Sequence, residues 1–297
     1  MLDSSWLWAL FTIIAAAAQT VRNATQRELT TTLGTAGATH VRFLFGLPFA
    51  VVFLGVVLLA SGQVLPSPPA IYWPWILQGS IAQIAATALM LAAMSDRSFV
   101  VVYAYIKTEP VQAALFGLVF LGDVVTTPMG VAILIATTGV VLMALKPGTR
   151  LDVRATLLGI AAGVMFALSA VGYRGAILSL GLPSYLMAAT FTLAVGLVIQ
   201  CVLVSVWLAL RDPKVLGAIA RHWRPSLLAG FLGAFASQFW FLAFALATAA
   251  SVRTLALVEV LFAQAISSFV FKQKTTMREG IGIVLIVIGV AALVWAH

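Results

Sequence analysis

The chain has 297 residues, of which 62% are hydrophobic and only 9% are charged, and its mean hydropathy is +1.10. Soluble domains are roughly 45–50% apolar and about 25% charged, so this composition excludes a soluble fold that hides its apolar surface. Lipid is the solvent that fits. The net charge of +8 comes from basic residues scattered through short loops, which is typical of topology signals and argues against a nucleic-acid partner.

The apolar runs predict an all-α integral membrane protein with ten spans, because a bilayer-spanning helix takes about 20 apolar residues. Turn-forming residues separate the runs, as at Ser61-Gly62, Gly122-Asp123 and Asp212-Pro213. The first run has no basic stretch before it and is interpreted as a span rather than a cleaved signal peptide. The predicted spans are 5–21, 36–60, 73–93, 99–121, 128–145, 156–176, 184–210, 227–249, 252–271 and 279–296.

The basic residues are distributed unevenly over the two predicted membrane faces. Arg174 and Arg253 are assigned to one face, while Arg42 and Lys107 lie within spans. The positive-inside rule therefore places the odd-numbered loops in the cytoplasm and both termini outside the inner membrane. The other 13 of the 17 Lys and Arg follow odd-numbered spans: Arg22, Arg27, Arg97, Lys146, Arg150, Arg154, Arg211, Lys214, Arg221, Arg224, Lys272, Lys274 and Arg278.

An internal repeat divides the chain into halves 1–147 and 148–297. Glu109, Gly130 and Gly139 each have an identical residue 150 positions later, at Glu259, Gly280 and Gly289. Gln83 and Gln238 are also matched, at a spacing of 155. An odd number of spans in each half inverts the second half relative to the first, so we expect two inverted five-helix repeats with a central cavity at the midplane.

Two stretches resemble one module of the drug/metabolite transporter superfamily, in its ten-span, two-repeat (EamA-like) branch. The first, 103–145, contains Glu109-Pro110, Leu121-Gly122-Asp123, Gly130 and Gly139-Val140; the second, 245–294, contains Glu259, Gly280 and Gly289-Val290. The chain departs from the family pattern where Val260 matches Pro110 and where Asp123 replaces the usual Glu.

The resemblance implies a secondary exporter of amino acids, aromatic ones among them, or of similar metabolites. It also implies that spans 5 and 10 lie outside the bundle that lines the cavity. Many family members are drawn with cytoplasmic termini, whereas the Lys and Arg count of this chain indicates the reverse. Export of drugs or other metabolites of the same superfamily stays open as an alternative.

Four charged residues are placed well inside predicted spans, where charge is costly and is by default a functional hypothesis. Glu109 and Glu259 could couple transport to protons or hold a substrate amine, or they could be structural carboxyls that hold broken helices together. Lys107 and Arg42 are the candidate compensating cations. Lys107 is two residues from Glu109, so the two side chains point to different faces of one helix. Arg42 is near a span end and could snorkel to the interface.

Uncharged residues complete the predicted site. Pro110 predicts a kink in the fourth span, because proline removes a backbone donor. Gln83, Gln238 and the mid-span Trp240 are predicted to line the cavity, although a packed core would explain Trp240 nearly as well.

Signals of catalysis are missing from the sequence. It has no Walker-type phosphate loop and no HExxH motif, and its three histidines are far apart. We therefore expect no enzyme activity, no metal and no cofactor, and a small-molecule substrate with protons as the candidate coupling ion. A membrane enzyme or sensor built on the same bundle is the alternative from another class.

Overall fold

The computed structural model describes residues 6–96, 102, 105–144, 153–269 and 276–296, and every regular element in these ranges is a helix. The all-α prediction is thus confirmed for the described chain. The elements are α1 (Leu7–Leu44), α2 (Leu47–Ser61), α3 (Tyr72–Asp96), α5 (Glu109–Phe116), the π-helix η2 (Gly117–Leu121), α6 (Thr127–Ala144), α7 (Val153–Ser179), α8 (Tyr185–Arg211), α9 (Pro213–Arg221), α10 (Trp223–Leu246), α11 (Ala249–Leu255), α12 (Val258–Phe269) and α13 (Met277–Trp295).

Six helical stretches of the described chain are long and apolar enough to cross a membrane, which is compatible with a multi-pass membrane protein. They are Glu28–Ser61, Tyr72–Ala93, Val153–Ser179, Tyr185–Arg211, Trp223–Leu246 and Met277–Trp295. Two shorter apolar helical stretches, Glu109–Leu121 and Thr127–Met143, match the predicted fourth and fifth spans. Parts of the predicted spans 99–121 and 252–271 lie outside the described residues.

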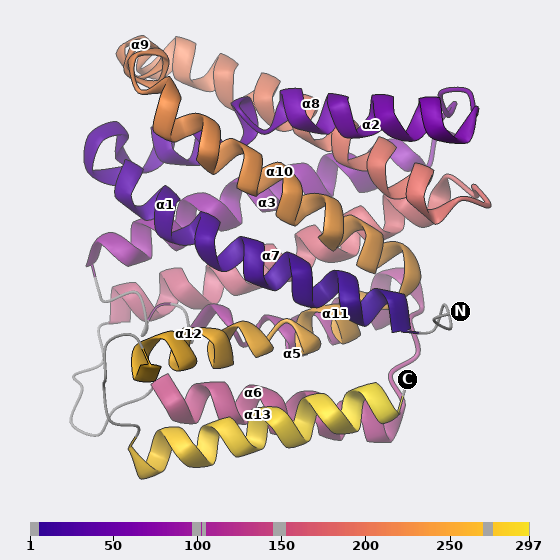
Figure 1. Cartoon of the computed structure of the whole chain (residues 1–297), viewed down its shortest axis with the longest axis vertical. Helices are drawn as coiled ribbons and strands as arrows, with labels where there is room; N and C mark the ends of the chain where they lie inside the picture. Colours follow the sequence, from indigo (N-terminus) through magenta and orange to yellow (C-terminus); the bar gives the residue numbers. More distant parts are fainter. Residues whose placement is uncertain (1–5, 97–101, 103–104, 145–152, 270–275, 297) are drawn as a thin grey trace.

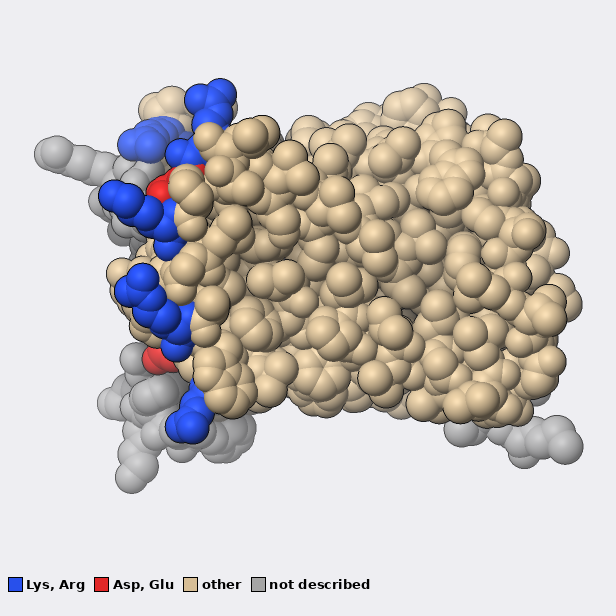
Figure 2. Space-filling model, turned by 90° about the horizontal axis from the view of Figure 1, so that it is seen from above, with Lys and Arg blue, Asp and Glu red and all other residues tan. Residues whose placement is uncertain are grey.

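The charged residues on the face seen in Figure 2 gather at one end. Figure 2 shows the described Lys and Arg gathered at one end of the visible face, with the remainder free of charge. Large apolar side chains cover the helices that face outward; Leu59 is 88% exposed and Leu210 is 80% exposed. Monomeric soluble proteins rarely expose apolar patches of this extent, so this surface suits a lipid environment.

The first helix is longer than the sequence predicts. The helical path of α1 continues without interruption to Gly34, whose φ of 66° is the first non-helical conformation. The expected end of the first span at 21 is therefore wrong, since the first basic residue in the chain, not a turn signal, marked that boundary. Arg22 consequently lies inside a helix and is only 1% exposed, so it is not a loop residue of the topology signal.

The predicted breaks at Ser61-Gly62 and Gly122-Asp123 are confirmed. Gly62 and Gly122 follow α2 and η2 with φ of 63° and 68°, a left-handed conformation in which glycine is the favoured helix terminator. The expected loop at 211–225 is instead mostly helical, because α9 begins at Pro213 and α10 at Trp223. Proline suits a first helical turn, where its missing N–H would have no intrahelical partner.

The two predicted halves interleave rather than forming separate bodies. α1 packs along α10, α3 along α7, and α6 along α13, so that each pair joins a helix of 1–147 to one of 148–297. Figure 1 shows α6 and α13 side by side at the lower edge of the bundle, where the resemblance places spans 5 and 10. It also shows the first turn of α1 and the last turn of α13 at the end opposite α9.

Candidate functional site

Both predicted spans that carry a glutamate are broken immediately before it. A turn at 107–108 precedes α5, and a turn at 256–257 separates α11 from α12. Glu109 and Glu259 each stand in the first turn of the helix that follows. Negative charge is favoured at a helix N-terminus, where backbone N–H groups are unsatisfied. The two repeat-related carboxyls therefore occupy the same local structure.

Pro110 does not kink a continuous helix as predicted. It lies in the first turn of α5, after the chain has already left the helical path at Lys107 and Thr108. The second half makes a comparable break with Val260 in place of proline. The break is therefore a property of both segments and does not depend on the proline ring.

Two ion pairs cross between the broken segments. Lys107 pairs with Glu259, and the Nε atom of Arg253 lies 2.7 Å from Oε1 of Glu109. All four residues are buried, with at most 6% of each exposed. The sequence analysis named Lys107 as a candidate compensating cation, and this ion pair joins it to Glu259 of the other half. Arg253, which the sequence analysis assigned to one membrane face, is a buried residue of α11.

A small cavity lies beside these ion pairs. Its volume of about 10 Å³ is room for about one water molecule, so this conformation is closed to any organic solute. The walls come from helices of both halves, which would have to part for a larger molecule to enter. The lining residues are Gln19, Arg22, Asn23, Met90, Ile106, Lys107, Glu109, Phe166 and Arg253.

Arg22 and Gln19 are site residues that the sequence analysis missed. Arg22 donates to Oδ1 of Asn23 through Nε and Nη2, at 3.2 and 2.6 Å. A signal for it was present, because Arg174 follows Arg22 at 152 positions, close to the repeat spacing. Because the first span was assumed to end at residue 21, Arg22 was interpreted as a loop residue despite this spacing.

Trp240 borders the cavity through two of the lining residues. Its indole N–H donates to Oε1 of Gln19 at 3.1 Å, and the guanidinium of Arg253 lies 4.7 Å from its ring centroid. A cation over an indole face is attracted by the ring quadrupole. Trp240 therefore contacts the site through Arg253 and Gln19, although it is not itself a lining residue of the cavity.

Gln83 and Gln238 lie outside the cavity lining, in two different networks. Gln83 accepts hydrogen bonds from Tyr173 at 2.8 Å and from Gln200 at 2.9 Å. Gln238 donates to Thr190 at 2.7 Å. The structure therefore does not bring these two repeat mates together.

Arg42 is buried in the bundle and does not snorkel. It is 2% exposed, and its Nη1 donates to Oγ1 of Thr87 on α3 at 3.1 Å. Its guanidinium also lies 5.5 Å from the ring centroid of Phe43. A Cβ added at Gly233 would stand 3.1 Å from Cγ of Arg42 and 3.7 Å from Cδ of Arg22, so these two arginine stems run past the same bare stretch of α10.

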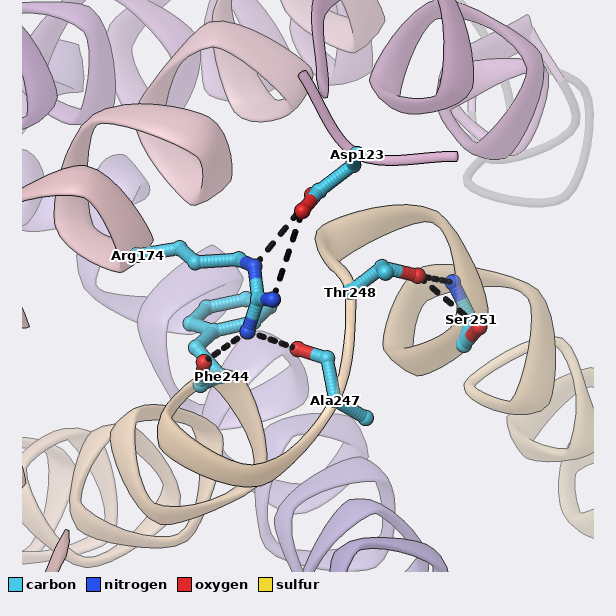
Figure 3. A network of polar contacts seen from close by, with 6 residues as sticks. All are labelled: Asp123, Arg174, Phe244, Ala247, Thr248 and Ser251. Carbon is cyan, nitrogen blue, oxygen red and sulfur yellow. Dashed lines mark hydrogen bonds and ion pairs between the residues drawn. The ribbon is translucent and has the colours of Figure 1, made fainter. Parts of the chain in front are cut away.

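A further polar cluster fastens the bundle at the end where the termini lie. Figure 3 shows Arg174 of α7 turned toward the turn between α10 and α11 and toward Asp123. Its Nη1 donates to the carbonyls of Phe244 and Ala247 at 2.7 and 2.6 Å. Nε and Nη2 reach the Asp123 carboxylate at 3.2 and 3.3 Å. One guanidinium thus ties three segments together: α7, the turn between α10 and α11, and the segment after η2.

A wider apolar pocket of about 400 Å³ opens between the start of α3, α7 and η2. It contains none of the charged residues described above. Gln78 is its polar lining residue and donates to the carbonyl of Leu168 at 3.0 Å. The lining comprises Ile71, Pro74, Trp75, Gln78, Phe120 and Leu168.

Comparison with known proteins identifies the fold alone. No family model and no curated protein matches the sequence. Among solved structures, the chain is similar to one described as "Crystal structure of protein", with a TM-score of 0.72, 15% sequence identity and coverage of 99% of both chains. At that identity the likeness extends to the backbone arrangement and assigns no substrate or activity.

Proposed function

We propose that the protein is a secondary transporter of the inner membrane that exports small organic metabolites, with amino acids as the favoured class. In this proposal ten spans form two inverted five-helix repeats, odd-numbered loops face the cytoplasm, and both termini lie outside. The observation that carries the proposal is the pair of crossed ion pairs, Lys107 with Glu259 and Arg253 with Glu109, beside a buried polar cavity.

Broken helices with ionisable side chains at their ends are the usual building blocks of a transport site in the bilayer midplane. Buried charges in a membrane are expensive and therefore point to a function. Because each ion pair joins the two halves of the chain, separating the halves would break both pairs. A solute or proton that binds one partner can compensate for that loss, which links binding to opening.

Alternating access then requires that the closed cavity open to one face at a time. Arg174 and its partners hold the bundle together at the end opposite the basic surface. Release of this cluster would open the cavity toward that end. Protonation of Glu109 or Glu259 is the proposed coupling step, since a neutral carboxyl no longer holds its cation.

The test is solute flux in proteoliposomes loaded with labelled amino acids, with and without a pH gradient. Saturable flux that loses its dependence on the gradient in Glu109→Gln or Glu259→Gln supports a proton-coupled exporter. If both variants transport like wild type across pH, the glutamates are structural and the coupling proposal fails. Catalytic turnover in detergent without any gradient would instead favour a membrane enzyme.

A further inference from the structure

The buried charges of the described chain do not balance. Four buried cations, Arg22, Arg42, Lys107 and Arg253, stand against two buried carboxylates, Glu109 and Glu259. Both carboxylates already have a cation, in Arg253 and Lys107 respectively. This leaves Arg42 as a buried cation for which the described residues offer no carboxylate.

The contacts of Arg42 leave its charge unpaired among the described residues. Among the described residues its polar side-chain partner is the hydroxyl of Thr87, and it forms no ion pair with a described carboxylate. A hydroxyl and an aromatic ring satisfy part of a guanidinium, which has five N–H donors and stays charged. A buried cation without a counterion is strongly disfavoured, so an anion that binds there would stabilise the bundle.

The position of Arg42 suits a ligand that enters the cavity. Thr87, its partner, lies one turn from Met90 on α3, and Met90 lines the cavity. From the other side, the Arg42 and Arg22 stems meet at Gly233, and Arg22 also lines the cavity. A small shift of flexible arginine side chains would therefore bring both guanidinium groups to one bound acid.

We propose that the solute is an organic anion, a metabolite with more acidic than basic groups, whose carboxylate binds between Arg42 and Arg22. Guanidinium and carboxylate match in a bidentate geometry that a lysine ammonium cannot reproduce. A neutral zwitterion brings its own ammonium group and so leaves the excess charge uncompensated. This inference deepens the proposed transport function and rests on it for the direction of movement, but not for the binding preference.

Two matched pairs of probes separate charge from size and shape. L-glutamate is more negative than L-glutamine by one unit of net charge, and phenylpyruvate is more negative than L-phenylalanine by the same amount. Binding is measured by thermal stabilisation of the purified protein in detergent, and transport by counterflow in liposomes. We expect the anion of each pair to bind at least about tenfold more tightly than its partner, the size of effect that one charge-assisted contact supplies.

The variants are Arg42→Gln, which removes the charge, Arg42→Lys, which keeps it, and Lys214→Gln, which removes a charge from the exposed start of α9. Arg42→Gln should abolish the preference for the anion, Arg42→Lys should retain part of it, and Lys214→Gln should leave it unchanged. Equal or tighter binding of glutamine and phenylalanine, no binding of any probe, or an unchanged preference in Arg42→Gln would overturn the inference.

Failure of the inference and failure of the transport proposal give different results. Saturable counterflow that favours glutamine or phenylalanine would support the transport proposal and contradict the anion site. An anion preference in binding, lost in Arg42→Gln, with no counterflow of any probe would keep the anion site and remove transport. If Arg42→Gln does not fold, a preference that is reduced in Arg42→Lys but not in Lys214→Gln supports the anion site, and an unreduced preference in Arg42→Lys overturns it.

Discussion

The Nε atom of Arg253 lies 2.7 Å from Oε1 of Glu109, although the two residues come from opposite halves of the chain. Trp240 covers the same guanidinium at 4.7 Å. Since Lys107 pairs with Glu259 in the reverse sense, each half supplies one cation and one carboxylate. The site is therefore shared between the halves, and neither half contains it alone.

Arg253→Gln should destabilise the protein markedly, because it leaves the buried Glu109 carboxylate without its cation. Breaking a buried pair from one side costs about 3–5 kcal/mol. The double variant Arg253→Gln/Glu109→Gln removes both charges and should recover much of that loss. Thermal unfolding in detergent measures both effects, and equal melting temperatures for the single and double variants would show that the pair contributes nothing.

Arg174→Ala should loosen the turn between α10 and α11, because Arg174 is the donor to the Phe244 and Ala247 carbonyls. Charge-assisted hydrogen bonds contribute about 1.5–3 kcal/mol, so amide hydrogen exchange in this turn should accelerate about tenfold or more. Asp123→Asn should give a smaller increase, since it leaves the carbonyl contacts in place. Unchanged exchange in Arg174→Ala would contradict a fastening role, and peptides from α6 serve as the internal control.

Gly289→Ala should destabilise the contact between α6 and α13. A Cβ at this position would lie 2.6 Å from the backbone nitrogen of Ala136, which cannot move aside as a side chain could. Overpacking of this kind typically costs about 1–3 kcal/mol. Gly280→Ala on the same helix meets nothing within 4 Å and should be neutral or slightly stabilising, as alanine is the better helix former. Similar melting temperatures for the two variants would argue against close packing here.

The proposed orientation predicts which loops a membrane-impermeant thiol reagent reaches. Cys201 is the one cysteine of the sequence and is buried, so Cys201→Ala provides a clean background. In intact cells, Gln63→Cys after α2 should be labelled and Lys214→Cys on α9 should be protected until the membrane is permeabilised. The opposite pattern would place the termini in the cytoplasm and contradict the proposed orientation.

Sequence patterns predicted helices that are apolar enough to span a membrane, because hydropathy is a local property of the chain. Six such stretches lie in the described chain. The ends at Ser61-Gly62 and Gly122-Asp123 followed from glycine, whose left-handed conformation terminates helices without strain. Glu109 and Glu259, which the repeat spacing matches, both stand in the first turn of a helix that follows a break. The sequence could not predict the end of the first helix, since a helix with a buried arginine at 22 looks in sequence like a span followed by a basic loop.

The sequence by itself indicated a lipid environment and an all-helical fold. It also identified two glutamates within predicted spans, where a charge is costly. Only the tertiary structure decided which cation pairs with which carboxylate, that Arg22 and Arg253 are buried, and that Arg42 has no described carboxylate partner. The physical reason is that hydropathy sums over neighbours in the chain, whereas an ion pair depends on a few ångströms between residues that are far apart in it.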